Sequence, residues 1–323
     1  LAERGVRIFS PEDGLRLGLA GMINTIVAEC DRDPLPTPVE DLEALAAGDQ
    51  RALARTITAL ELGRLAPHLR NELRARAAAR PVPVLGITGT GGSGKSSLTD
   101  ELIQRFRLDQ EDKLRIAVLA VDPTRRRGGG ALLGDRIRMN AVEAPQVMFR
   151  SLATRGASEV PEAVDDAILA CKAAGHDLVI VETPGIGQGH AGIVDHVDLS
   201  VYVMTPEYGA ASQLEKIDML DLADVVVVNK LERRGAEDAL RDVRKQVARN
   251  REAFGTPPEA LPVFGTIAAR FNDDGVTALY QHLRGELAGR GLPVSEGRLA
   301  PVPHRASTKV SSIVPPSRSR YLA

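Results

Sequence analysis

The chain has 323 residues, of which 43% are hydrophobic and 26% charged, and its formal net charge is −2. This composition is typical of a globular protein of one or two domains, and the lack of excess basic charge argues against nucleic acid as the main partner. No run of about 20 apolar residues and no apolar leader is visible, so we expect a cytoplasmic protein with no membrane contact.

The first quarter of the chain, residues 1–80, is expected to be a small helical segment. Ser10 and the Pro-Glu-Asp that follows it form a helix start signal, and no β-branched run precedes Pro81. Apolar residues at helical spacing predict helices over residues 14–30, 39–49, 50–65 and 68–79.

From residue 81 to 290, short apolar runs alternate with helical patterns. The expected strands are residues 82–88, 114–122, 146–150, 176–182, 198–204, 224–229 and 261–265. The expected helices are residues 95–106, 161–174, 213–222, 235–252 and 275–287. Such alternation predicts an α/β fold with a mostly parallel sheet covered by helices on both faces. Ligands in these folds bind beyond the carboxyl ends of the strands.

Residues 291–323 contain five prolines and little periodicity. We expect an extended linker rather than a packed element. Because a linker ends the chain and Leu1 rather than Met begins it, we also expect the sequence to be part of something longer.

The sequence GTGGSGKS, residues 89–96, matches the phosphate-binding pattern G-x-x-x-x-G-K-[ST] between an expected strand and an expected helix. Glycines in this pattern let successive N–H groups converge on phosphate oxygens, and the helix adds its positive end. Lys95 is expected to reach the β- and γ-phosphates as a catalytic residue, and Ser96 to hold Mg²⁺. The expected phosphate contacts are Gly91, Gly92, Ser93, Gly94, Lys95, Ser96 and Ser97.

Three carboxylates accompany this loop. Asp122 and Glu182 end expected strands, and Asp135 lies in LLGDRIRM. Oxygen ligands suit Mg²⁺, so we expect these three residues and Ser96 to form a metal site, with Asp122 also catalytic. The alternatives are capping or loop hydrogen bonds for Asp122 and Glu182, and surface pairing with Arg136 or Arg138 for Asp135.

Residues 182–189, ETPGIGQG, resemble the D-x-x-G switch of GTPases with Glu in the Asp position. Gly185 is expected to donate its N–H to a γ-phosphate. Gln188 is the candidate for orienting a catalytic water, although it lies three residues after Gly185 rather than directly after it, and a loop hydrogen bond is the alternative. Residues 125–127, three arginines, are expected to be a solvated loop, with a switch-loop arginine as the alternative.

The run VVVVNKLE ends a strand with Asn229, Lys230 and Glu232. GTPases use N-K-x-D at this place, where the carboxylate accepts hydrogen bonds from guanine. Glu232 offers the same acceptors one methylene further out, so guanine is the expected base. A second base-contacting loop is expected in FGTIAA, residues 264–269, with Thr266 using its backbone.

Together, GTGGSGKSS, AVDPT, GGALLGDRIRM, ETPGIGQG and NKLE resemble the GTPase chaperones of adenosylcobalamin-dependent acyl-CoA mutases, relatives of the methylmalonyl-CoA mutase accessory protein. The resemblance covers about residues 81–290. RIFSPEDGLRLGLAGMI and SSIVPPSRSRYLA are similar to the exit from a cobalamin domain and the entry to a mutase domain in the fused isobutyryl-CoA mutases. The chain is therefore identified as the middle part of such a fused protein.

The resemblance implies a P-loop fold that binds GTP or GDP with Mg²⁺ and gates the loading and protection of adenosylcobalamin in an acyl-CoA mutase. It implies cobalamin and mutase partner domains in the same chain and a homodimer of the whole protein. The cobalamin-binding histidine motif is absent, so the cofactor is not expected to bind here. Glu232 and His190, which stands where relatives have an acidic residue, depart from the family pattern.

Two other functions stay open, and a third is set aside. A P-loop small-molecule kinase needs an acceptor site and an arginine lid, for which residues 125–127 are available. A nucleotide-gated docking module would hydrolyse GTP only incidentally. A nickel-inserting GTPase shares the fold, but the sequence has no His and Cys cluster to carry nickel.

Overall fold

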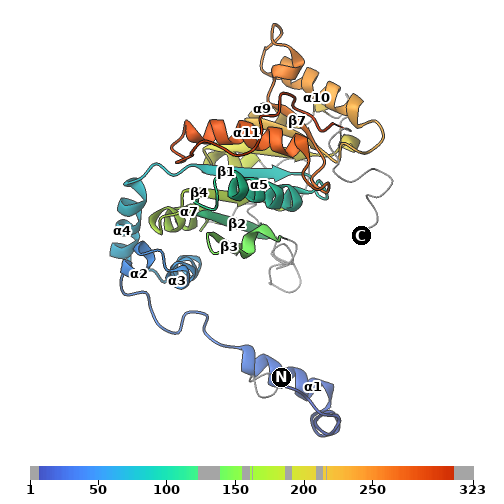
Figure 1. The fold of residues 1–323 in the computed structure, drawn as a ribbon. Coiled ribbons are helices and arrows are strands. Elements are labelled where there is room, and N and C mark those ends of the chain that lie inside the picture. Colours follow the sequence, from blue (N-terminus) through green and yellow to red (C-terminus); the bar gives the residue numbers. More distant parts are fainter. Residues whose placement is uncertain are drawn as a thin grey trace.

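The computed structural model describes residues 7–122, 139–154, 161, 163–185, 191–208, 214–215 and 217–308 (Figure 1). Its strands are β1 (Val84–Gly89), β2 (Ile116–Asp122), β3 (Val147–Ala153), β4 (Leu178–Glu182), β5 (Leu199–Met204), β6 (Val225–Asn229) and β7 (Val263–Thr266). Its α-helices are α1 (Pro11–Cys30), α2 (Glu43–Ala46), α3 (Gln50–Glu61), α4 (Pro67–Ala78), α5 (Lys95–Asp109), α7 (Val164–Ala173), α9 (Met219–Leu222), α10 (Ala236–Asn250) and α11 (Asp274–Ala288).

The strands form one parallel seven-stranded sheet in the order β3-β2-β4-β1-β5-β6-β7. The expected α/β fold with a mostly parallel sheet is confirmed, and each expected strand is present. β1 lies between β4 and β5, so the loop that follows it opens between the carboxyl ends of those two strands. This order places the phosphate-binding sequence near the middle of the carboxyl edge.

Alternate residues of each strand are buried in different cores. Leu85 and Ile87 of β1 pack with α5 and α11 on one face, whereas Val84 packs with α3, α4 and α7 on the other. A separate cluster buries α9 and α10 against the outer strands. Because both faces are covered, the strands read as continuous apolar runs rather than as an alternating pattern.

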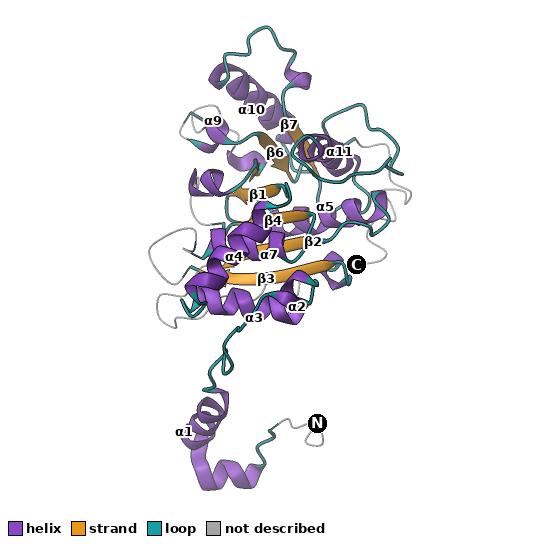
Figure 2. Ribbon diagram, turned by 90° about the vertical axis from the view of Figure 1, so that its left-hand side faces the viewer, coloured by secondary structure: helices purple, strands orange, loops and turns teal. Residues whose placement is uncertain are grey.

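The helices at the front of the chain do not form one separate segment as expected. Leu53, Leu69 and Leu73, from α3 and α4, are buried in the same core as β2 and β4, so these helices are part of the sheet-containing body. α1 buries no residue and projects away from that body (Figure 2). Its predicted start is a capping box between Ser10 and Asp13.

One predicted helix is much shorter than expected: within residues 39–49 the helix spans only Glu43–Ala46. Of the predicted helix 213–222, the structure describes helix at Leu214 and over Met219–Leu222, while residues 213 and 216 lie outside the described residues. Leu214 and Ile217 are both buried and joined by a tight backbone hydrogen bond of 3.2 Å.

Residues 292–308 form no helix, but they differ from the expected linker because they pack on the body. Leu292 is buried and Val294, Leu299 and Val302 pack against the core beneath α5 and α11. Ala306 forms a parallel bridge with Gly265 of β7. None of the helices in the described part of the chain is long and apolar enough to span a membrane.

Candidate nucleotide-binding site

The phosphate loop leaves the end of β1 and enters α5. Gly92 and Gly94 have φ angles of 71° and 86°, a region that favours glycine, and Gly94 is the residue before the helix. The backbone N–H of Thr90 donates to the carbonyl of Val203 on β5 at 3.3 Å, which ties the loop to the neighbouring strand. The N-terminus of α5 therefore opens onto the carboxyl edge of the sheet, as a phosphate site requires.

Lys95 lies folded back over the loop. Its Nζ donates to the carbonyl oxygens of Gly89 and Thr90, each at 3.1 Å, and the side chain is buried. This holds the ammonium group beside the strand end of the loop, where an incoming phosphate would compete with the two carbonyl oxygens for it. Ser97, also predicted to contact phosphates, is exposed on the first turn of α5.

Ser96 and Glu182 meet across the loop. The hydroxyl of Ser96 donates to Oε1 of Glu182 at 2.6 Å. Glu182 ends β4 and lies opposite Ile87 of β1, while Asp122 ends the next strand, β2, and is 2% exposed. A hydroxyl and two carboxylates at one edge are hard oxygen donors that fit Mg²⁺.

These donors do not enclose an ion by themselves. In the described ranges, no three His, Cys, Asp or Glu side chains lie close enough together to hold a metal. The set fits an ion completed by phosphate oxygens rather than by protein alone. Asp135, the third predicted carboxylate, lies outside the described residues.

Gly185, which follows β4, lies against the phosphate loop. A Cβ on this glycine would stand 2.6 Å from Nζ of Lys95 and 2.8 Å from Cα of Gly91. The close approach brings the switch-like segment within reach of any group bound to the loop. Gln188, His190 and residues 125–127 lie outside the described residues.

Asn229, the last residue of β6, joins three parts of the site. Its Nδ2 donates to the carbonyl of Ser93 at 2.8 Å. Its Oδ1 accepts from the hydroxyl of Thr266 at 3.0 Å and from the N–H of Ala268 at 3.1 Å. The side chain is 2% exposed, so these bonds hold the phosphate loop and the loop after β7 at a fixed spacing.

The two other residues of the NKxE motif lie at the surface. Lys230 has a φ of 62° and donates from Nζ to the carbonyl of Gly92 at 2.7 Å, covering the outer side of the phosphate loop. Glu232 is exposed in the turn that follows. The structure thus places Asn229 and Lys230 on the phosphate loop, with Glu232 beyond them toward solvent.

The loop after β7 uses residues that the sequence reasoning missed. Thr266 contributes its hydroxyl as well as its backbone, and Ala268 contributes its N–H. Asp273, fully buried, accepts from the N–H of Ile267 at 3.2 Å and caps α11 at Val276. Asp273 stands three residues before Val276, the first apolar residue of a helical pattern, and an Asp at that place is an N-cap signal that would have identified it.

Comparison with known families places these features in a wider group. Residues 53–285 match the sequence model of the methylmalonyl-CoA mutase-associated GTPase MeaB. The matched range includes the phosphate loop, the switch-like segment, the Asn229 motif and the loop after β7.

Four similar curated proteins are fused isobutyryl-CoA mutases. The protein from Nocardia farcinica is 66% identical over the whole chain, and that from Geobacillus kaustophilus is 49% identical over the whole chain. The chain spans only 30% of the length of each of these two proteins. A protein from Pyrococcus abyssi, named as a GTPase, is 34% identical over 85% of the chain and 84% of its own length.

Solved structures share the fold. A structure titled LAO/AO transport system kinase superposes with a TM-score of 0.53 at 24% identity, covering 77% of this chain and 76% of the other. HypB from Helicobacter pylori in complex with nickel gives a TM-score of 0.50 at 14% identity over 70% of this chain and 96% of HypB. At these identities the likeness concerns the arrangement of strands and helices.

Proposed function

The chain belongs to the family of methylmalonyl-CoA mutase-associated GTPases, and from this premise we propose that it binds GTP and GDP with Mg²⁺ and hydrolyses GTP at the site around Lys95 and Asn229. The observation that carries the proposal is the hydrogen-bonding of Asn229. One buried amide connects Ser93 of the phosphate loop with Ala268 of the loop after β7. A base placed between those loops would have its phosphates on α5.

Base selection is proposed to fall to Glu232 and the loop after β7. The exposed carboxylate of Glu232 follows the Asn229-Lys230 pair by two residues and is free to turn toward a base edge. A carboxylate accepts two hydrogen bonds from adjacent N–H groups, a pattern that guanine offers and adenine does not. Thr266 and Ala268 would line the opposite side of the base.

The phosphates and the metal are proposed to sit at Lys95, Ser96, Glu182 and Asp122. Lys95 would leave the two carbonyl oxygens that it now contacts and bind β- and γ-phosphate oxygens, placing positive charge where charge develops during phosphoryl transfer. Mg²⁺, when bound, would neutralise phosphate charge, with the Ser96 hydroxyl and the Glu182 and Asp122 carboxylates holding it directly or through water. The N–H of Gly185 would donate a hydrogen bond to the γ-phosphate, and Gln188 is proposed to orient the attacking water.

The wider role rests on the relatives. We propose that this unit gates the loading of adenosylcobalamin into an acyl-CoA mutase and protects that cofactor, as part of a fused isobutyryl-CoA mutase that is a cytoplasmic homodimer. Relatives named for that activity match the whole chain with 30% of their length, which leaves room for cobalamin and mutase domains beside it. Adenosylcobalamin would bind in those domains. The GTPase unit itself is proposed to extend from the α2 region to residue 308, because both ends pack on its cores.

The experiment that tests guanine binding is calorimetric titration of GDP and ADP with Mg²⁺ into the wild-type chain and into Glu232→Ala. We expect GDP to bind more tightly than ADP, and Glu232→Ala to lose about tenfold or more in GDP affinity because hydrogen bonds to a charged group are lost. Arg234→Ala, which changes an exposed residue of the same turn, is the matched control. Equal binding of GDP and ADP would reject the GTPase proposal and favour a kinase.

A second measurement separates the GTPase from a docking module. GTP turnover is followed for the chain alone and in the presence of the cobalamin and mutase domains of a fused relative. Turnover that changes with the partner domains supports gating, whereas turnover that is unaffected supports a docking role in which hydrolysis is incidental.

A further inference from the structure

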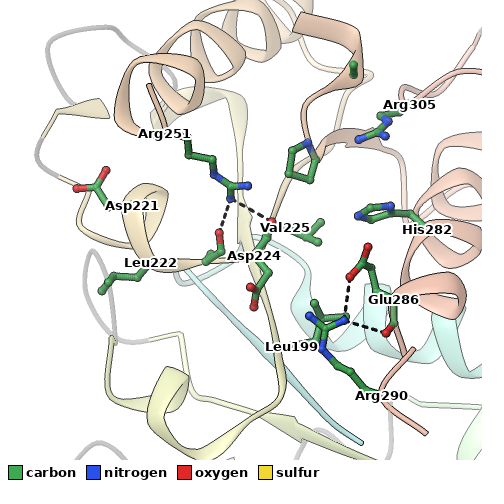
Figure 3. A pocket seen from close by; sticks show the side chains of 13 residues that line it. Leu199, Asp221, Leu222, Asp224, Val225, Arg251, His282, Glu286, Arg290 and Arg305 are labelled. Carbon is green, nitrogen blue, oxygen red and sulfur yellow. Dashed lines mark hydrogen bonds and ion pairs between the residues drawn. The ribbon is translucent and has the colours of Figure 1, made fainter. Parts of the chain in front are cut away.

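Apart from the nucleotide site, a second pocket lies at the amino-terminal ends of β5 and β6, and Figure 3 shows the side chains that line it. Its volume is about 380 Å³, and Leu199 and Val225, the first residues of β5 and β6, line its floor together with Pro262 just before β7. The carboxyl ends of the same strands carry Asn229 and Thr266. The pocket is therefore separated from the nucleotide site by the length of the strands.

Two arginines converge on this pocket from different elements. Arg251, directly after α10, donates to the carbonyl oxygens of Ala223 and Asp224 at 2.6 and 3.0 Å. Arg305 belongs to residues 292–308, the C-terminal segment. It donates to the carbonyl of Leu261 at 2.6 Å and stacks 5.2 Å from the ring centroid of Phe264. In the part of the chain that the structure describes, neither guanidinium forms an ion pair with a carboxylate.

A histidine and a third arginine lie beside these two groups, and burial lowers the pKa of His282, which favours its neutral form. His282 of α11 packs on Phe264, the side chain that Arg305 also contacts, with the two ring centroids 5.2 Å apart. Arg244 of α10 lies close enough to Arg305 for the two charges to interact, and burial lowers its pKa, as it does those of Arg251 and Arg305. These cations are costly to hold together without a counter-ion.

The acidic residues around the pocket compensate this charge only in part: Asp224 attracts Arg251 and Glu259 attracts Arg244, and among the described residues no acidic side chain does so for Arg305. Glu286 pairs with Arg290 at 2.8 Å. Oδ2 of Asp224 accepts from the N–H and the hydroxyl of Ser200 at 2.7 and 2.8 Å. Asp221 is exposed, and Figure 3 places it at the outer side of the pocket, away from Arg305 and His282.

We propose that this pocket binds a small phosphate-bearing anion, with Arg251 and Arg305 as its main contacts and His282 at its edge. Guanidinium groups match the geometry of phosphate oxygens and approach them from two sides of the pocket. A doubly or triply charged phosphate compensates several cations at once, which a single carboxylate does not. The volume lies within the range of small-molecule sites.

The test is calorimetric titration of inorganic pyrophosphate, without metal, into the chain carrying Lys95→Ala, which weakens the phosphate loop. Arg251→Gln and Arg305→Gln are added to this background, with Arg249→Gln, an exposed arginine of α10, as the matched control. We expect each pocket substitution to lower pyrophosphate affinity about tenfold or more, since a charge-assisted hydrogen bond is removed, and the control to have no effect.

Thermal unfolding of each variant checks that it folds. If Arg305→Gln does not fold, the decision rests on Arg251→Gln and on the NMR signals of the His282 ring, which should shift on addition of pyrophosphate. Equal affinity in Arg251→Gln and Arg249→Gln, with no change at His282, would overturn the proposal. Because every variant compared carries the same weakened phosphate loop, this outcome is independent of whether the nucleotide site selects guanine.

Discussion

The hydroxyl of Ser307 donates to Oδ2 of Asp273 at 2.7 Å, and the same carboxylate oxygen accepts from the N–H of Ile267 at 3.2 Å. The C-terminal segment is thereby tied to the loop that we propose contacts the base. Asp273 also connects to the helix of the phosphate loop, since Arg105 of α5 donates to its carbonyl at 3.1 Å. A displacement of the C-terminal segment would be transmitted to both sides of the nucleotide site.

Ser307→Ala should weaken GDP binding without touching the nucleotide. Loss of a hydrogen bond to a buried carboxylate costs about 1.5–3 kcal/mol, part of which should appear as a GDP affinity about three- to tenfold lower. Ser295→Ala is the control, because Ser295 bonds Gln110 in the same segment, away from the base loop. Calorimetry with GDP and unfolding in urea measure the two effects. An equal loss of GDP affinity in both variants would show that the segment stabilises the fold without special coupling to the base loop.

Ser96→Ala should reduce Mg²⁺-dependent binding and turnover. The hydroxyl that now donates to Glu182 at 2.6 Å is the proposed metal ligand, so we expect the apparent Mg²⁺ affinity during GTP hydrolysis to fall about 10- to 100-fold. Ser97→Ala changes the adjacent, exposed serine and should leave it unaltered. The measurement is GTP hydrolysis against Mg²⁺ concentration. The same Mg²⁺ dependence in both variants would remove Ser96 from the metal site.

Gly185→Ala should disturb the phosphate loop. The added Cβ would meet Nζ of Lys95 at 2.6 Å and Cα of Gly91 at 2.8 Å, so the loop or the lysine must move. We expect a GDP affinity about tenfold lower, read by calorimetry. Gly255→Ala is the control for replacing a glycine as such, because a Cβ at Gly255 meets no atom within 4 Å. Wild-type affinity in Gly185→Ala would mean that this segment moves away when nucleotide binds.

The buried side chain of His176 should make the folded protein less stable in mild acid. Burial lowers the pKa of this side chain to about 4, although its Nδ1 contacts the carbonyl of Cys171 at 3.0 Å. As pH falls from about 6.5 to 4, the unfolded chain takes up a proton that the folded chain does not, so the free energy of unfolding decreases. At about 1.4 kcal/mol per pKa unit, the decrease is about 3 kcal/mol.

Urea unfolding at pH 7 and pH 5 measures the part of this decrease that falls above pH 5, about 2 kcal/mol. His176→Asn should remove most of the pH dependence in this window, whereas His68→Asn, at an exposed position, should retain it. A wild-type pH dependence in His176→Asn would assign the acid sensitivity to other groups.

The amino-acid sequence alone determined the sheet and the phosphate loop. Each of the seven apolar runs became a strand, because parallel strands buried on both faces need apolar residues at every position. The glycines around Lys95 specify a backbone that few other residues adopt, so local sequence was sufficient there. The range of α2 was overestimated, since amphipathic spacing does not say whether tertiary packing favours a helix or a turn.

Only the tertiary structure decided how distant segments meet. Asn229 connects to Ser93 and Ala268, and Asp273 to Ser307, through hydrogen bonds between segments distant in the sequence, which local spacing does not determine. The packing of residues 292–308 likewise comes from long-range contacts with α5, α11 and β7, which cannot be predicted from a proline-rich sequence. The arginines of the second pocket are brought together by the same process, because their elements become neighbours only when the sheet is complete.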